Sequence, residues 1–280
     1  MDSQVSQAAQ CYVPFFDKLG RPLVSVIIPT KNSQATLEIC LDSIRRQTYD
    51  KIEIIIVDSG SRDSTRDIAA SFGATIVSHN SKMAAARNFG SKLARGDFLF
   101  HMDSDMKLSP RVVEKCILAL QDGACAAVVP QIYEGEGFFG KCRALEFKCL
   151  VDDRLIKSSR FMTRVAFETV GGYDDSLDAG EDWDITQKIE FRYKIAYIGV
   201  PLVHGWGKYS LSKTMRKSYN YGKTVKLYMK KYPEHSRHQW GPMRVMHLNL
   251  GLLSQDTFHA IGLFFMKFCE FGAGCIGMMV

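Results

Sequence analysis

Three polar side chains directly follow apolar, β-rich runs of the chain and are the first residues that could take part in chemistry. Thr30 follows LVSVII and a proline, Asp58 follows IEIIIV, and Asp103 follows DFLFHM. Short apolar runs of this kind predict buried strands. The ligand crevice of an open α/β sheet lies beyond the carboxyl ends of its strands, so these three residues are expected to line one crevice. There, the Asp58 carboxylate could accept hydrogen bonds from a nucleobase or a ribose.

The sequence Asp103-Ser104-Asp105 could hold a divalent cation. Two carboxylates this close at a strand end can meet around Mg²⁺ or Mn²⁺, which prefer oxygen ligands and often bridge to phosphates. A single Asp-x-Asp motif is more commonly a solvated turn. His204, at the end of a later predicted strand, could be a third metal ligand or a phosphate donor, although a structural histidine explains it equally well.

A second acidic segment could supply a general base. Five carboxylates stand within nine residues, at Asp174, Asp175, Asp178, Glu181 and Asp182. Some of them could simply favour the start of a helix through the helix dipole. One of them, held near Trp183, could have its pKa raised by desolvation into the range that suits proton transfer.

Arg87, in AAARNFG, lies on a predicted helix whose start faces the same crevice. Its guanidinium could pair with a phosphate. The alternative is an ordinary ion pair on the helix surface.

The order of elements predicts an α/β fold with a mostly parallel sheet flanked by helices. Strands and helices alternate over the first 130 residues, which is typical of such a sheet. Further helices are expected near 110–120, 141–151 and 181–191, with strands near 126–130, 161–165 and 196–200. We expect an irregular N-terminal arm over 1–21, one catalytic domain over 22–209, and a C-terminal region over 210–280 that is basic, helical and amphipathic.

A glycine pattern, Gly135-x-Gly137-x-x-Gly140, matches the dinucleotide-binding motif. Glu134 and Glu136 would repel a pyrophosphate, so the segment is interpreted as a flexible loop near an acceptor site.

Composition and charge narrow the class of protein. Hydrophobic residues make up 46% and charged residues 24%, which excludes a disordered chain. Eight cysteines without a C-x-x-C pair favour reduced thiols and a cytoplasmic protein without structural zinc. Between Lys208 and Arg244, ten Lys or Arg face one acid, Glu234. This block predicts an anionic partner: a membrane surface, a pyrophosphate or nucleic acid.

The tail from 258 to 280 is apolar, but Lys267 and Glu270 interrupt it, and neither an N-terminal signal peptide nor an obvious membrane span is expected. Ile261, Phe264, Phe265 and Phe268 fall on one helical face. The tail is either a core-packing helix or a helix that lies in a membrane interface beside the basic block.

Taken together, the motifs resemble those of the inverting family-2 glycosyltransferases of GT-A fold. The resemblance runs from Pro22 to about Tyr209 and rests on the segments VSVIIPTKN, IEIIIVDSGSRDST, AAARNFG, GDFLFHMDSDM and GGYDDSLDAGEDWD. It implies a nucleotide-sugar donor, UDP- or GDP-linked, and a Mg²⁺ or Mn²⁺ cofactor.

Residue roles follow from this resemblance. Thr30 and Asp58 would contact base and ribose, and Arg87 would support the nucleotide pocket. Asp103 would face the ribose or a metal-bound water, and Asp105 would ligate the cation. Asp182 would deprotonate the acceptor hydroxyl, with Glu181 orienting the acceptor or the site. His204 loosely matches a metal-binding histidine of some members.

The function expected is therefore metal-dependent transfer of a sugar, with inversion, to a hydroxyl of a lipid-linked glycan or polysaccharide on the cytosolic membrane face. A nucleotide-sugar-binding module without catalysis is the first alternative. A sugar nucleotidyltransferase is the second, although PTKNSQAT lacks the glycines of a triphosphate loop. Tyrosines interleave with lysines in the basic block, but without a recognised fold there we expect no specific nucleic-acid partner.

Overall fold

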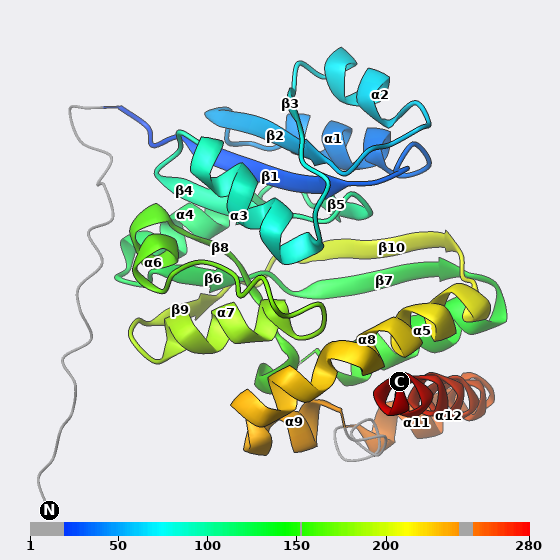
Figure 1. Cartoon of the computed structure of the whole chain (residues 1–280). Coiled ribbons are helices and arrows are strands. Elements are labelled where there is room, and N and C mark those ends of the chain that lie inside the picture. The colour runs from blue at the N-terminus through cyan, green and yellow to red at the C-terminus, as the bar shows by residue number, and fades with distance from the viewer. Residues whose placement is uncertain (1–19, 152, 241–248) are drawn as a thin grey trace, which may run out of the picture.

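The computed structural model describes residues 20–151, 153–240 and 249–280; the expected N-terminal arm thus falls almost entirely outside the described residues. Its centre is a seven-stranded sheet with the order β3-β2-β1-β4-β8-β6-β9 (Figure 1). The strands are β1 (Val24–Thr30), β2 (Ile52–Asp58), β3 (Thr75–Ser78), β4 (Phe98–His101), β6 (Ala126–Val128), β8 (Ser159–Thr163) and β9 (Ile195–Tyr197).

Only β8 runs against its two neighbours, and the other pairs in this sheet are parallel. The predicted α/β fold with a mostly parallel sheet is therefore confirmed. Strand β1 is buried along its whole length, because both faces of a helix-covered sheet are removed from water.

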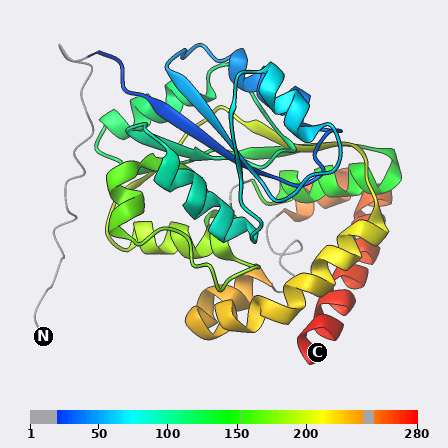
Figure 2. The same cartoon turned by 45° about the horizontal axis from the view of Figure 1, so that its top comes forward.

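Helices cover both faces of this sheet, as Figures 1 and 2 show. The alternate side chains Val24, Val26 and Ile28 of β1 pack in one core with α1, α2 and α4, while Ile27 packs in a second core with α3, α6 and α7. These helices are α1 (Leu37–Arg45), α2 (Thr65–Ser71), α3 (Met83–Leu93), α4 (Val112–Gln121), α6 (Arg164–Thr169) and α7 (Glu181–Glu190). Leu37, Leu41 and Ile44 are buried, as the apolar face predicted for this helix requires.

A second sheet, which the sequence analysis did not predict, has the order β5-β10-β7. Its strands are β5 (Met106–Leu108), β10 (Leu202–Lys208) and β7 (Gln131–Glu136). Strand β10 runs antiparallel to β5 and parallel to β7. This pairing brings His204, on β10, next to Met106, in the segment that follows Asp103 and Asp105.

The predicted flexible loop at the glycine motif is wrong. Gly135 belongs to β7, and Gly137 begins helix α5 (Gly137–Cys149), so the motif is a strand-to-helix junction. A Cβ on Gly135 would lie 2.8 Å from the Cα of Gly140. The glycines therefore allow the start of α5 to pack directly against the strand.

The C-terminal region is a layer of helices against α5 (Figure 1). It contains α8 (Leu211–Lys231), α9 (Pro233–Gln239), α11 (Leu250–Gln255) and α12 (Thr257–Met279), with a short 3₁₀ helix, η1 (Arg154–Ile156), contacting α9. Helix α8 confirms the helix expected in the basic block. Residue Arg244 of that block lies outside the described residues.

Helix α12 has a buried face and an exposed apolar face. Leu263 and Met266 are buried against Cys142 and Leu145 of α5. By contrast, Ile261 is 71% exposed and Phe268 76% exposed. By its length and composition, α12 could span a bilayer. Core helices of soluble proteins also meet these two criteria.

Candidate active site

Thr30 and Asp58 end neighbouring strands and lie side by side. They are register partners at the carboxyl ends of β1 and β2, and the Thr30 hydroxyl donates to Asp58 Oδ1 at 3.3 Å. Burial alone would raise the pKa of Asp58, but hydrogen bonds from Ser61, Arg66 and Thr30 lower it below its usual value. Asp58 is thus a fixed, ionised acceptor at the carboxyl end of its strand.

Asp103, Asp105 and His204 form a compact cluster of possible metal ligands. Their nearest ligand atoms all lie within 4.8 Å of one another. His204 Nε2 is 3.6 Å from Asp105 Oδ1 and 3.8 Å from Asp103 Oδ2. His204 is distant from the two aspartates in the sequence and lies near them because β10 pairs with β5.

The orientation of His204 suits a metal ligand. Its Nδ1 lies 2.8 Å from Oε1 of Gln131. An amide oxygen can only accept, so Nδ1 carries the proton and the Nε2 lone pair faces the two carboxylates. Burial lowers the pKa of His204 despite the nearby acids, which favours the neutral imidazole that metals bind. Two carboxylate oxygens and one imidazole nitrogen are a donor set that fits Mn²⁺ better than Mg²⁺, which prefers oxygen ligands only.

Arg87 and Arg160 connect this cluster to the second acidic segment. The Arg87 guanidinium donates to Asp103 Oδ1 and to Asp182 Oδ1, both at 2.6 Å, and to Glu181 at 3.3 Å. Arg160, on β8, donates to Asp182 Oδ2 at 2.6 Å and lies 3.3 Å from Asp103 Oδ2. The two arginines therefore hold the predicted donor-side acid and the predicted base in one network.

The position of Arg87 corrects one interpretation from the sequence. Its side chain is only 1% exposed, so it is not a surface ion-pair partner. Its two terminal nitrogens donate to three carboxylates, those of Asp103, Glu181 and Asp182. In this structure Arg87 positions acidic side chains, and its predicted support of the nucleotide pocket would act through Asp103.

The electrostatics separate the acids of the site. Burial and the Asp182 carboxylate raise the pKa of Glu181 to about 7. Burial would also raise the pKa of Asp103, but Arg160 and Arg87 hold it well below its usual range. Thus Asp103 stays ionised at neutral pH, whereas Glu181 exchanges a proton there, as desolvation of one acid in this segment was expected to allow.

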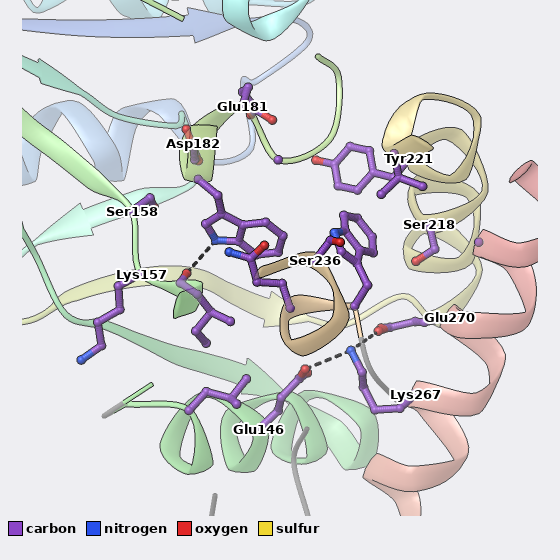
Figure 3. A pocket seen from close by; sticks show the side chains of 18 of the residues that line it. Glu146, Lys157, Ser158, Glu181, Asp182, Ser218, Tyr221, Ser236, Lys267 and Glu270 are labelled. Carbon is purple, nitrogen blue, oxygen red and sulfur yellow. Dashed lines mark hydrogen bonds and ion pairs between the residues drawn. The ribbon is translucent and has the colours of Figure 1, made fainter. Parts of the chain in front are cut away.

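A cavity of about 700 Å³ opens beside Glu181 and Asp182. It lies between α5, α8, α9 and α12, and Figure 3 shows Glu181 and Asp182 on one side of it and Glu146, Lys267 and Glu270 on the other. Thr30, Asp58 and Asp105 are not among its lining residues. Asp182 thus stands between the acidic cluster that follows the strand ends and the cavity under the C-terminal helices.

Three residues near the centre were missed by the sequence analysis. Arg160 lies in β8, and the sequence of this strand contains no motif that indicates a functional residue. Tyr221 of α8 lines the cavity, and Lys217, one turn earlier, has its ammonium 5.4 Å from the Tyr221 ring centroid. The basic block was the available signal for Lys217, but nothing in the sequence distinguished it from the other lysines of the block.

The amino-acid sequence is similar to those of known glycosyltransferases. A sequence model of the family described as Glycosyl transferase family 2 matches residues 25–173. EpsH of Bacillus subtilis, named as a glycosyltransferase, is 36% identical over 107 residues, which cover 36% of this chain and 31% of EpsH. A glycosyltransferase of Haemophilus influenzae is 26% identical over 181 residues, covering 60% of this chain and 62% of that protein. The matched stretch is thus about a third of EpsH and under two thirds of the Haemophilus protein.

Solved structures show the same fold. The mannosyltransferase PcManGT from Pyrobaculum calidifontis, solved with GDP-Man and Mn²⁺, superposes with a TM-score of 0.63 at 19% identity, covering 92% of this chain and 87% of that one. TarS 1-349 of S. aureus, solved with UDP-GlcNAc, gives 0.55 at 16% identity, covering 88% of this chain and 81% of that one. Because the family model spans more than half of the residues, the chain belongs to glycosyltransferase family 2.

Proposed function

We propose that this protein transfers a sugar from a UDP- or GDP-linked donor to a hydroxyl of a lipid-linked glycan or polysaccharide acceptor, with inversion at the anomeric carbon. The observation that carries the proposal is the shared network around Arg87 and Arg160. It joins Asp103, of the candidate metal cluster, to Asp182 beside a cavity large enough for an acceptor. The family supplies the expectation of inversion.

The donor would bind at the strand ends. Thr30 and Asp58 provide a buried polar edge for base and ribose, and Asp105 is the most solvent-accessible acid of the metal cluster, with 47% of its side chain exposed. PcManGT was solved with GDP-Man and Mn²⁺ and TarS 1-349 with UDP-GlcNAc, which supports both donor types. Mn²⁺ held by Asp105, Asp103 and His204 would neutralise charge that develops on the departing diphosphate.

The acceptor hydroxyl would lose its proton to Asp182. Arg87 and Arg160 each contact one oxygen of this carboxylate, and each oxygen has a second lone pair for the incoming proton. The same two contacts fix the orientation of the carboxylate, which is what a general base needs. Glu181, whose pKa is about 7, would orient the acceptor. Its own ionisation would change the charge beside Asp182.

We place the enzyme on an anionic membrane surface on the cytosolic side. Supporting this, α12 presents exposed apolar side chains, including Ile261 and Phe268, while α8, which packs against α12, exposes Lys213, Lys223 and Lys226. Apolar insertion with adjacent cationic contacts is how interfacial helices bind.

Full-length protein should float with vesicles containing anionic lipid. The double variant Ile261→Ser and Phe268→Ser should remain in the soluble fraction, and equal flotation of both proteins would remove the membrane assignment.

A thermal-shift panel tests the central proposal. Nucleoside diphosphates are added with Mn²⁺, with Mg²⁺ or with chelator, and we expect UDP or GDP to stabilise the protein in a Mn²⁺-dependent way. The matching nucleotide sugar should then be consumed with an acceptor extract. Stabilisation without any transfer would favour a binding module, and the absence of metal-dependent stabilisation by every nucleotide would reject the proposal.

A further inference from the structure

We propose that the cavity under the C-terminal helices binds the apolar chain of the acceptor, so that the acceptor is an amphiphile whose hydroxyl lies at Asp182. This rests on the proposed function, because it assumes that Asp182 faces an acceptor. It adds the substrate class and the binding site: a lipid chain held inside the protein, rather than a free sugar bound at the surface.

The walls of the cavity are largely apolar. Leu150, directly after α5, Val225 and Met229 of α8, and Phe271 and Met278 of α12 line it. An apolar cavity of about 700 Å³ lies in the range of sites that enclose a small ligand. A sugar chain carries a hydroxyl on almost every carbon and would lose its hydrogen bonds to water against such walls. A hydrocarbon chain loses none and gains by leaving water.

Four charged side chains on the far side of the cavity neutralise one another. Lys267 pairs with Glu146 at 3.0 Å and with Glu270 at 2.8 Å, and Arg143 contacts the same two carboxylates. Two cations and two anions in mutual contact carry no net charge. Figure 3 shows Lys267 between Glu146 and Glu270 at this end of the cavity. These four side chains therefore offer no net charge to a ligand.

The opposite end of the cavity is the reaction centre. Glu181 and Asp182 line it there, and Trp183 forms a wall beside them while its indole N–H donates to the carbonyl of Ile156 at 2.8 Å. The single cavity therefore runs from an apolar region to a polar one. A molecule that fills it must have an apolar part and, next to Asp182, a polar part.

Helix α12 connects this cavity to the proposed membrane surface. Cys275 lines the cavity, and the neighbouring Ile276, about 100° further round the helix, is 59% exposed. A lipid in a bilayer that contacts the exposed face of α12 would therefore lie next to the cavity. This juxtaposition supports a membrane lipid as the source of the acceptor chain.

Quenching of tryptophan fluorescence by a brominated detergent tests the proposal. Two of the three tryptophans, Trp183 and Trp240, line the cavity. Dibromododecyl maltoside, used below its micelle concentration with full-length protein, Mn²⁺ and nucleotide, should quench in a saturable way because bromine acts on contact. Unbrominated alkyl maltosides should displace it, with affinity rising by up to about fourfold per added methylene.

Cavity-filling variants separate the inside of α12 from its outside. Cys275→Phe should weaken the probe at least about tenfold, and the matched Ile276→Phe, one residue away on the exposed side, should leave binding unchanged. If Cys275→Phe loses its nucleotide-induced stabilisation, Met229→Phe blocks the same cavity from α8. Equal quenching in the blocked and control variants would mean that detergent coats the surface, and would overturn the proposal.

The controls distinguish failure of the lipid-site proposal from failure of the proposed glycosyltransferase reaction. Absence of quenching, or displacement by maltohexaose as effectively as by dodecyl maltoside, would reject the lipid chain while Mn²⁺-dependent nucleotide stabilisation left the proposed function standing. Quenching without nucleotide stabilisation would retain a lipid site and reject the glycosyltransferase reaction.

Discussion

Asp103 and Asp182 are held by the same two arginine side chains. Arg87 lies 2.6 Å from both carboxylates, and Arg160 lies 3.3 Å from Asp103 and 2.6 Å from Asp182. These acids come from different parts of the sequence, after β4 and at the start of α7. The shared cations hold three carboxylates, including that of Glu181, close together despite the repulsion between them.

Removing Arg87 should therefore destabilise the fold strongly. Arg87→Met keeps much of the side-chain volume but leaves buried carboxylates with fewer partners, so we expect a loss of about 3–5 kcal/mol in chemical unfolding. The matched control is Arg95→Met, at a surface pair with Glu53 where Arg95 is 79% exposed; it should cost about 1 kcal/mol or less. Equal effects of the two substitutions would contradict the buried network.

The parts of this site differ in how far the sequence could predict them. Asp58 and Asp103 were predicted together because a buried parallel strand gives a continuous apolar run with a clear end. Strands β7 and β10 were missed because glycines and charges interrupt their sequences, QIYEGE and LVHGWGK, and they become strands mainly by pairing with each other. Arg160 lacked any local signal because its importance comes from two carboxylates that only folding brings near.

Asp182→Asn tests the assignment of the general base. Asparagine keeps the shape but cannot take up the proton, so transfer should fall by about 10²–10⁴-fold. Nucleotide binding with Mn²⁺ should persist, because Asp182 does not belong to the candidate metal cluster. Steady-state transfer and thermal shift on the same preparation check both parts. Transfer within a few fold of the native rate would show that another group, Glu181 first, takes the proton.

Glu181 should make stability depend on pH. Its pKa is about 7 in the folded protein, against an ordinary value of 4.5, so between these values the folded state binds more protons than the unfolded state. Stability should therefore fall as pH rises from 4.5 through 7. Glu181→Gln cannot ionise, so from pH 5 to pH 8 its stability relative to the native protein should rise by up to about 3 kcal/mol.

The exposed Glu190, on the same helix, provides the control for this pH experiment. Glu190→Gln should follow the native protein at every pH in urea unfolding. If Glu181→Gln follows it too, burial does not hold the Glu181 proton as proposed.

His204 should contribute to Mn²⁺ affinity. His204→Ala removes one of the three clustered groups, and we expect Mn²⁺ binding, followed by electron paramagnetic resonance, to weaken by at least about 10-fold. Gln131→Leu removes the acceptor that orients the imidazole and should weaken binding by about 10–100-fold. His238, on α9, pairs with Asp153 and serves as the control. His238→Ala should leave the Mn²⁺ affinity unchanged. Unchanged affinity in His204→Ala would restrict the site to the two aspartates.

Two glycines of α12 should respond in opposite ways to the same substitution. A Cβ on Gly277 would clash with the carbonyl oxygen of Tyr219, because α12 and α8 approach closely there, whereas a Cβ on Gly272 would meet nothing within 4 Å. Gly272→Ala should gain up to about 1 kcal/mol from helix propensity. Gly277→Ala gains the same propensity but must push the helices apart, so we expect a net loss of about 1–3 kcal/mol. Urea unfolding of both variants compares them directly. Stabilisation by both substitutions would mean that α12 does not pack tightly on α8, and the walls of the cavity between these helices would have to be redrawn.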